Sequence, residues 1–214
     1  MTGELMARNT LTLRRHPRQE RAQSLVNDVL TATIKVIDRV GYQKANTNLI
    51  ARMAGVSVGS LYQYFPNKKV IFAKLIERLE DDKRSTFIDI TKSVSHLAPI
   101  HQVTPVVTKI MDQVFKERQL LNDLYRHASE LDRLEYIAQS QASVAEDLSR
   151  VLQKHHEAIK PRDHRLAAFI VTNSFCGVVE ALVRDDVDED RWEAAKVQLI
   201  TLIKSYLFLP QGES

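Results

Sequence analysis

Residues that break helices are scarce in this sequence, and apolar residues recur along it at the spacing of one helix face. Six glycines and six prolines are spread over 214 residues, too few to punctuate the many short strands of a β-sandwich or barrel. From Gln23 to Val40 the apolar residues repeat at intervals of three and four, and Gly41 supplies a stop. No segment keeps a strand pattern, so the sequence predicts an all-α fold.

Capping residues and prolines set the expected boundaries of the other helices. Asn46, Ser57 and Asn67 are placed as N-caps, and Thr104-Pro105 is placed as an N-cap followed by proline in the first helical position. Residues 93–103 are expected to form a loop. The expected helices are 46–54, 58–64, 67–92, 104–116, 118–130, 134–159, 163–184 and 190–209.

Charge is distributed unevenly along the chain. Residues 1–70 contain eleven Lys or Arg and four Asp or Glu, a formal charge of +7, whereas the remainder carries −4. A basic first third joined to an acidic body is the pattern of a nucleic-acid-binding module attached to a second, different module. A merely charged, soluble surface is the alternative that charge alone leaves open.

Cysteine use and hydropathy indicate where the protein works. A single cysteine, Cys176, excludes an intramolecular disulfide framework and a multi-cysteine zinc site. We find no apolar run approaching the roughly 20 residues of a membrane-spanning helix, and no secretory signal. We therefore expect a cytoplasmic protein with no membrane partner.

The segment from Asn46 to Lys68 carries the most specific signal. It predicts a helix, a tight turn at Gly55 and a second helix, which is the arrangement that presents a recognition helix to the DNA major groove. This segment resembles the TetR (tetracycline repressor)/AcrR family of transcriptional regulators. The family pattern stands here as Ile50-Ala51, Ala54-Gly55-Val56-Ser57, Gly59-Ser60-Leu61-Tyr62, Tyr64-Phe65 and Lys68.

The resemblance is strong over residues 21–79 and limited to helix order and length beyond them. It implies an N-terminal three-helix helix-turn-helix domain followed by a larger helical ligand-binding and dimerisation domain. The expected domains are a flexible basic arm (1–20), the helix-turn-helix domain (21–66), a helical effector-binding and dimerisation domain (67–209) and a tail (210–214).

Two kinds of DNA contact are expected from this segment. Hydroxyls, and helix starts with free N–H groups, suit phosphates, whereas side chains that project from the recognition helix suit base edges. The resemblance places DNA contacts at the same positions, although the family often has a basic residue where Asn48 stands. The expected phosphate contacts are Thr47, Tyr62, Tyr64 and Lys68, and the expected base-reading set is Asn48, Val58, Gly59, Ser60 and Gln63.

Alternatives stay open at two of these places. Tyr62 and Tyr64 would also serve as a partly buried aromatic pair that stabilises a small three-helix domain. The arginines of the arm fit either a solvated tail or a segment that enters the minor groove. These arm residues are Arg14, Arg15 and Arg18.

The helix expected over 163–184 is apolar nearly all round, which implies two buried faces. One face would pack within the chain and the other against a twin copy, as in the two C-terminal helices through which the resembled family dimerises. Packing within one chain alone is the alternative. The expected dimer residues are Phe169, Ser174, Gly177, Ala181, Leu199, Leu202 and Tyr206.

Effector-binding residues are less well defined by the sequence. A mostly apolar cavity with a few polar groups is expected between the middle helices, although each candidate also fits an ordinary core. No metal and no cofactor are expected, because His155 and His156 diverge on a helix and no base is placed beside Cys176. The candidate effector residues are Phe87, Met111, Phe115, Tyr125, His127 and Asn173.

These patterns favour a repressor that binds a palindromic DNA operator as a homodimer and is released by a small hydrophobic or amphipathic effector. An architectural or occlusion protein of the same fold, bound to DNA without a ligand, is the second hypothesis. An all-α enzyme is the third, and we do not expect it, because the sequence shows no acid/base pair, glycine-rich phosphate loop or metal cluster.

Overall fold

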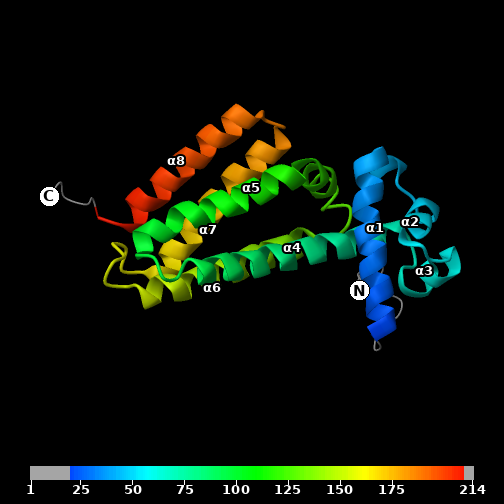
Figure 1. Cartoon of the computed structure of the whole chain (residues 1–214), viewed down its shortest axis with the longest axis horizontal. Coiled ribbons are helices and arrows are strands. Elements are labelled where there is room, and N and C mark those ends of the chain that lie inside the picture. Colours follow the sequence, from blue (N-terminus) through cyan, green and yellow to red (C-terminus); the bar gives the residue numbers. More distant parts are fainter. Residues whose placement is uncertain (1–19, 210–214) are drawn as a thin grey trace, which may run out of the picture. The chain divides into compact units, whose positions relative to one another are not determined.

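The structure is a computed structural model that describes residues 20–209, in which every regular element is a helix (Figure 1). The prediction of an all-α fold is therefore confirmed. The helices are α1 (Glu20–Lys44), α2 (Thr47–Ala54), α3 (Val58–Tyr64), α4 (Lys68–Ser93), α5 (Pro99–Tyr125), α6 (Leu134–Lys154), α7 (His164–Arg184) and α8 (Glu189–Leu207).

The described chain divides into two compact units. Unit 1 comprises residues 20–79 and 120–136, and unit 2 comprises residues 80–119 and 137–209. Helices α4 and α5 each contribute residues to both units. The arginines expected in the arm, and the tail expected over 210–214, lie outside the described residues. The domain ranges given above stay a prediction.

The helix-turn-helix forms where caps and turn residues allow it. Asn46 Oδ1 accepts a hydrogen bond from Leu49 N at 3.0 Å, and Ser57 Oγ accepts one from Ser60 N at 2.9 Å. Gly55 between the helices has φ 69°, a left-handed conformation that glycine adopts without steric cost. The N-caps expected at Asn46 and Ser57 and the tight turn are confirmed, as is the N-cap at Asn67, whose Oδ1 accepts from Val70 N at 3.0 Å. Thr104, the fourth expected N-cap, lies inside α5 instead.

Unit 1 packs around apolar side chains that α1, α2, α3 and the first part of α4 turn inward. Ile50 of α2 and Leu61 of α3 are fully buried, as is Phe65 directly after α3. These side chains fix the faces that α2 and α3 present outward. The first turns of α4 add Val70, Ile71, Phe72, Ala73, Leu75 and Ile76, and α1 adds Val29, Leu30, Ala32, Val36 and Ile37.

Gly41 interrupts α1 as the sequence predicts. Its φ of 75° and ψ of 163° are not helical, and the chain resumes one short turn to Lys44. A positive φ at this point favours glycine over residues with a side chain. The regular part of α1 therefore ends at Gly41, and Tyr42 begins a turn that leads toward α2.

The two helices expected over 104–116 and 118–130 are wrong, because α5 is one continuous helix from Pro99 to Tyr125. Pro99 takes the first helical position, which suits its missing N–H. Pro105 lies inside the helix and forfeits one backbone hydrogen bond. Burial of Val107 and Met111 on one face favours a continuous helix nonetheless.

Two helix ends come earlier than expected. α5 ends at Tyr125 instead of 130, and α6 ends at Lys154 instead of 159. No glycine or proline lies between residues 106 and 160, so neither end has a breaker signal. The turn between these helices contains Asp132 with φ 52°, a conformation that aspartate tolerates better than most residues.

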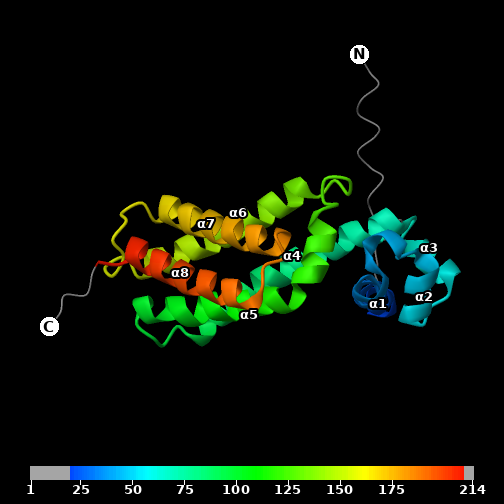
Figure 2. The same cartoon turned by 90° about the horizontal axis from the view of Figure 1, so that it is seen from above.

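Unit 2 packs α5 to α8 with the second part of α4. α7 and α8 lie side by side (Figures 1 and 2). Trp192 of α8 is 1% exposed and its indole lies 5.2 Å from the ring of Phe115. Lys196 of α8 is buried and forms an ion pair with Asp112 of α5. An apolar core and a charged link thus hold α8 to α5.

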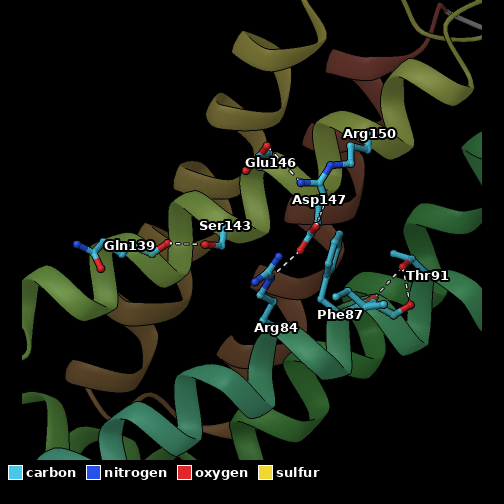
Figure 3. A network of polar contacts seen from close by, with 9 residues as sticks. Arg84, Phe87, Thr91, Gln139, Ser143, Glu146, Asp147 and Arg150 are labelled. Atoms are coloured by element: carbon cyan, nitrogen blue, oxygen red, sulfur yellow. Dashed lines mark hydrogen bonds and ion pairs between the residues drawn. The ribbon is translucent and has the colours of Figure 1, made fainter.

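A buried carboxylate joins α4 to α6 in the same unit. Asp147 is 9% exposed, and Figure 3 shows Arg84 of α4 and Arg150 of α6 pointing toward it. Arg84 Nε donates to Asp147 Oδ2 at 2.8 Å, and Arg150 Nη1 donates to Asp147 Oδ1 at 2.5 Å. Two charge-assisted hydrogen bonds offset the cost of burying this carboxylate.

α7 requires a correction to the expectation about membrane helices. By length and composition this helix is long and apolar enough to cross a membrane. Part of its apolar surface faces the core of unit 2, where Ala167, Ala168 and Val171 are buried. A helix that buries one face in a core and exposes a second apolar face has the same composition.

Candidate nucleic-acid interface

The side chains expected to read bases lie on the outer surface of α2 and α3. Asn48 and Gln63 are exposed, and Val58 retains 37% of its exposure. Ser60 is half-buried, and its hydroxyl lies 2.8 Å from Ser57 Oγ. Gly59 is exposed as well, so four of the five residues are available to a partner, and their role in reading DNA stays a prediction.

Gly59, the fifth residue, has no packing reason to be glycine. A Cβ built on it meets only Ser57 Oγ, at 3.7 Å, which is an ordinary van der Waals contact. Its φ is not in the left-handed region. Packing within the described chain therefore does not require glycine here, and a close approach by DNA to this backbone stays a prediction.

Two hydroxyls meet beside this surface. Thr47 Oγ1 at the start of α2 lies 3.1 Å from the hydroxyl of Tyr62 on α3, and Tyr62 is 39% exposed. The pair brings the expected phosphate contacts of two helices to one place. Tyr64, the other tyrosine of α3, is half-buried.

Lys68, expected to contact phosphate, is engaged within unit 1. Its Nζ donates to Tyr42 O at 2.8 Å and to Gln43 O at 3.2 Å. The nitrogen also lies 4.8 Å from the ring centre of Tyr42 and 5.3 Å from that of Phe72. Burial lowers the pKa of the Lys68 ammonium from its ordinary value.

Sequence reasoning did not single out Tyr42, which lies at the centre of unit 1. Its ring stacks on His127 with 3.9 Å between ring centres, and its backbone N–H donates to Asp123 Oδ2 at 3.4 Å. Burial, followed by the nearby Glu130 carboxylate, raises the pKa of the Tyr42 hydroxyl. The available sequence signal for Tyr42 was an aromatic residue directly after the Gly41 stop. No local pattern indicated that His127 and Asp123 would be its partners.

The six candidate effector residues fall in different units. Phe87 and Met111 are buried in unit 2, where Phe115 is half-buried and Asn173 is exposed. Tyr125 and His127 belong to the 120–136 segment of unit 1. Only Phe87, Met111, Phe115 and Asn173 therefore lie in one compact unit, and their role in ligand binding stays a prediction.

The candidate dimer residues lie on α7 and α8 with different exposures. Phe169 and Leu202 keep 57% and 51% of their exposure, and Gly177 faces open space. Leu199, in contrast, is 3% exposed and belongs to the core of unit 2. Ser174, Ala181 and Tyr206 are half-buried.

Metal-ligating and nucleophilic side chains are not assembled in the described part. Among residues 20–209, no group of three His, Cys, Asp or Glu side chains is placed to hold a metal ion. Burial, followed by the Glu180 carboxylate, raises the pKa of the Cys176 thiol to about 11. The thiolate that nucleophilic chemistry needs is therefore disfavoured at neutral pH.

Residues 20–209 contain a capped helix-turn-helix whose second helix turns polar side chains outward, and every regular element among them is a helix. This combination defines a DNA-binding regulator of the helix-turn-helix class. Two family models cover most of the described residues. Residues 29–75 match the bacterial regulatory proteins of the tetR family, and residues 100–207 match the tetracyclin repressor-like C-terminal domain. The chain belongs to the TetR family of transcriptional regulators.

Curated relatives agree with this assignment. The chain is 32% identical over 114 residues to the fatty acid metabolism regulator protein of Bacillus subtilis, covering 46% of this chain and 59% of that protein. It is 37% identical over 75 residues to the nucleoid occlusion factor SlmA of Actinobacillus pleuropneumoniae, covering 35% and 36%. The chain thus spans less than two thirds of the length of these relatives.

Solved structures show the same fold. A putative TetR-family transcriptional regulator from Mesorhizobium loti matches with a TM-score of 0.72 at 14% identity, over 89% of this chain and all of that one. SmeT, described as the repressor of the Stenotrophomonas maltophilia multidrug efflux pump SmeDEF, matches with a TM-score of 0.65 at 15% identity, over 90% and 94%.

Proposed function

We propose that this chain is a cytoplasmic repressor that binds a palindromic operator as a homodimer and leaves it when a small hydrophobic or amphipathic effector binds. The observation that carries the proposal is the outer surface of α2 and α3, where Asn48 and Gln63 are exposed beside the paired Thr47 and Tyr62 hydroxyls. Amides suit base edges and hydroxyls suit phosphates, so this surface has both kinds of group that specific DNA binding requires.

Dimerisation is proposed from the apolar side chains that unit 2 leaves exposed. α7 exposes Leu166, Phe169 and Ile170, and α8 exposes Val197 and Leu202. Apolar side chains gathered on neighbouring helices favour association with a complementary surface. The same apolar surface on a second copy can cover it across a two-fold axis, and such a dimer would place two recognition helices on the two halves of a palindrome.

Effector release is proposed from the apolar interior of unit 2 and from similar proteins. Phe87 and Met111 lie inside that unit, and Phe115 packs against Trp192. SmeT, which has a similar fold, has been solved as a complex with triclosan, and a similar Bacillus subtilis protein is described as a fatty acid metabolism regulator. A small apolar or amphipathic molecule is the effector class that fits these observations.

A second candidate function is an occlusion protein that stays on DNA without a ligand. The 37% identity to the nucleoid occlusion factor SlmA favours it. Both candidates need the same DNA-binding surface, and they differ only in whether a small molecule changes DNA affinity.

The experiment is selection of genomic fragments by the purified protein, followed by footprinting of the enriched sites. The repressor proposal expects a two-fold symmetric footprint and loss of binding with one member of a panel of fatty acids, acyl thioesters and phenolic biocides. Binding that no panel member weakens, at sites scattered outside promoters, would favour the occlusion protein. A protein that enriches no sequence would contradict both.

A further inference from the structure

Four carbonyls, those of residues 41–44, lie in the short turn that follows the regular part of α1. Gly41 O accepts from Ala45 N at 3.1 Å, and Lys44 O accepts from Asn46 Nδ2 at 3.4 Å. The remaining two carbonyls, between these, accept their hydrogen bonds from the ammonium of Lys68.

These hydrogen bonds join Lys68 to Tyr42 and Gln43, which lie 26 and 25 residues earlier in the chain. All of α2 and α3 lies between the two joined places. Lys68 therefore ties the end of α1 to the start of α4 on either side of the helix-turn-helix. We call this tie the Lys68 clasp.

Lys68 has little left to offer a phosphate. Two of its three N–H donors are committed to backbone carbonyls. Its nitrogen also lies over the rings of Tyr42 and Phe72, which attract the cation. A move toward DNA would break both kinds of contact.

Lys69, the next residue, has an ammonium group that is not engaged by other side chains or carbonyls of the described chain. Lys69 also lies in the first turn of α4, but it is exposed, and its side chain makes no hydrogen bond or ion pair with any residue between 20 and 209. An exposed ammonium beside the positive end of a helix dipole suits a phosphate.

We propose that Lys68 is a positioning residue, which holds the helix-turn-helix in its binding geometry through the clasp, and that Lys69 neutralises the DNA phosphate at the start of α4. The proposal rests on the proposed DNA-binding function. It separates two roles that neighbouring lysines in one helical turn would otherwise share.

The salt dependence of DNA binding distinguishes the two roles. Each lysine that neutralises a phosphate contributes about 0.9 to the slope of log affinity against log salt concentration. A lysine that only holds the protein in shape contributes stability and affinity, but it leaves this slope unchanged.

The test compares Lys68→Met and Lys69→Met with the parent on the genomic fragment that the parent selects. Methionine keeps an apolar stem over the Tyr42 and Phe72 rings while removing the ammonium. The measurements are Tm without DNA, affinity well below both Tm values, and the salt slope of that affinity. A Lys68→Arg variant, which restores a donor for the carbonyls, serves as the conservative replacement.

We expect Lys69→Met to keep the parental Tm and lower the salt slope by about 0.9 for each bound protomer. Lys68→Met should lower Tm and affinity at the parental slope, and Lys68→Arg should recover part of both. A smaller slope for Lys68→Met, or a parental slope for Lys69→Met, would overturn the assignment while the proposed function stands. If folded Lys68→Met binds DNA with the parental affinity, the clasp is a structural contact only, and this result would also overturn the assignment. Failure of the parent to bind DNA would overturn both.

Discussion

Gln63 and Tyr62 are neighbours on α3 that offer DNA different chemistry. Gln63 is exposed and its amide carries a donor and an acceptor together, which is the pairing that adenine presents in the major groove. Tyr62 offers one hydroxyl, already 3.1 Å from Thr47. We expect Gln63→Ala to cost about 1–3 kcal/mol on the operator and little on random DNA.

Tyr62→Phe is the matched control, because it removes a hydroxyl and keeps the ring. It should weaken binding on all sequences and leave the preferred sequence unchanged. Selection from randomised DNA measures both effects. If Gln63→Ala returns the parental preference at every position, then Gln63 does not read a base.

Gly59 allows a test that separates stability from binding. Because nothing in the chain fills the space of its Cβ, Gly59→Ala should stabilise the protein by up to about 1 kcal/mol through helix propensity. The same methyl group should weaken DNA binding if a DNA strand approaches this backbone. Urea unfolding and operator titration measure the two quantities. Gains in both would show that no close approach occurs there.

Cys176 predicts a pH dependence of reactivity. Its thiol pKa is raised from 9.0 to about 11 by burial and by Glu180, so at pH 8 the folded protein has a roughly hundredfold smaller thiolate fraction than the unfolded chain. Alkylation by iodoacetamide should be correspondingly slower in native protein than in urea. Equal rates would contradict the raised pKa.

The same shift links pH to stability. The folded state holds the thiol proton more tightly than the unfolded chain, so this contribution is fully present below pH 9 and is lost as pH rises through about 11. Unfolding midpoints measured on either side of that window, with a Cys176→Ser variant as the control, would show the loss.

Sequence reasoning identified residues whose function depends on near neighbours. The caps Asn46 and Ser57 bond to backbone groups three residues away, and such local motifs are visible in a sequence. The Lys68 clasp and the Arg84–Asp147 ion pair join residues 26 and 63 positions apart. No local pattern specifies which distant acceptor a lysine or arginine finds.

At the scale of elements, the outer faces of α7 and α8 carry the dimer prediction. The exposed apolar residues Phe169 and Leu202 belong to these two helices. Because a two-fold interface repeats every contact, Phe169→Glu or Leu202→Glu would place like charges on both sides of it. We expect the parent to sediment at twice the 24.5 kDa chain mass and both variants to sediment as monomers.

Gln153→Glu is the control, since it adds the same charge at an exposed polar position of α6, outside the two helices that carry the dimer prediction. It should leave the dimer intact if the apolar residues drive association. A parent that stays monomeric at micromolar concentration would remove the argument for a two-fold operator. If Phe169→Glu and Leu202→Glu both still form dimers, the interface lies on another surface.

Helix ends were predictable where sequence signals were strong. Gly41 and Gly55 mark ends that the structure confirms. The start signal of α5 was instead assigned to Pro105, whereas Pro99 opens the helix. A proline near a helix start and one six residues further along present the same local pattern. Burial of the surrounding face, which depends on tertiary packing, decides between them.

At the scale of the whole molecule, the units do not follow the order of the chain. Residues 120–136 belong to unit 1 through contacts such as that of Tyr42 with Asp123, 81 positions away. Prediction from the sequence assigns residues that are adjacent in the chain to the same domain. It therefore cannot detect that residues 120–136 pack with unit 1 after residues 80–119 have formed part of unit 2. The class of fold was predictable from periodicity because periodicity is local.

Trp192 is the single tryptophan of the sequence, and it is buried in unit 2. Tryptophan emission during denaturation therefore reports the opening of that unit, whereas far-ultraviolet circular dichroism reports the helices of both. If the two units melt together, the two curves coincide. Separate curves would show that one unit loses its structure while the other persists, and an added small molecule that shifts only the emission curve would reveal which unit it binds.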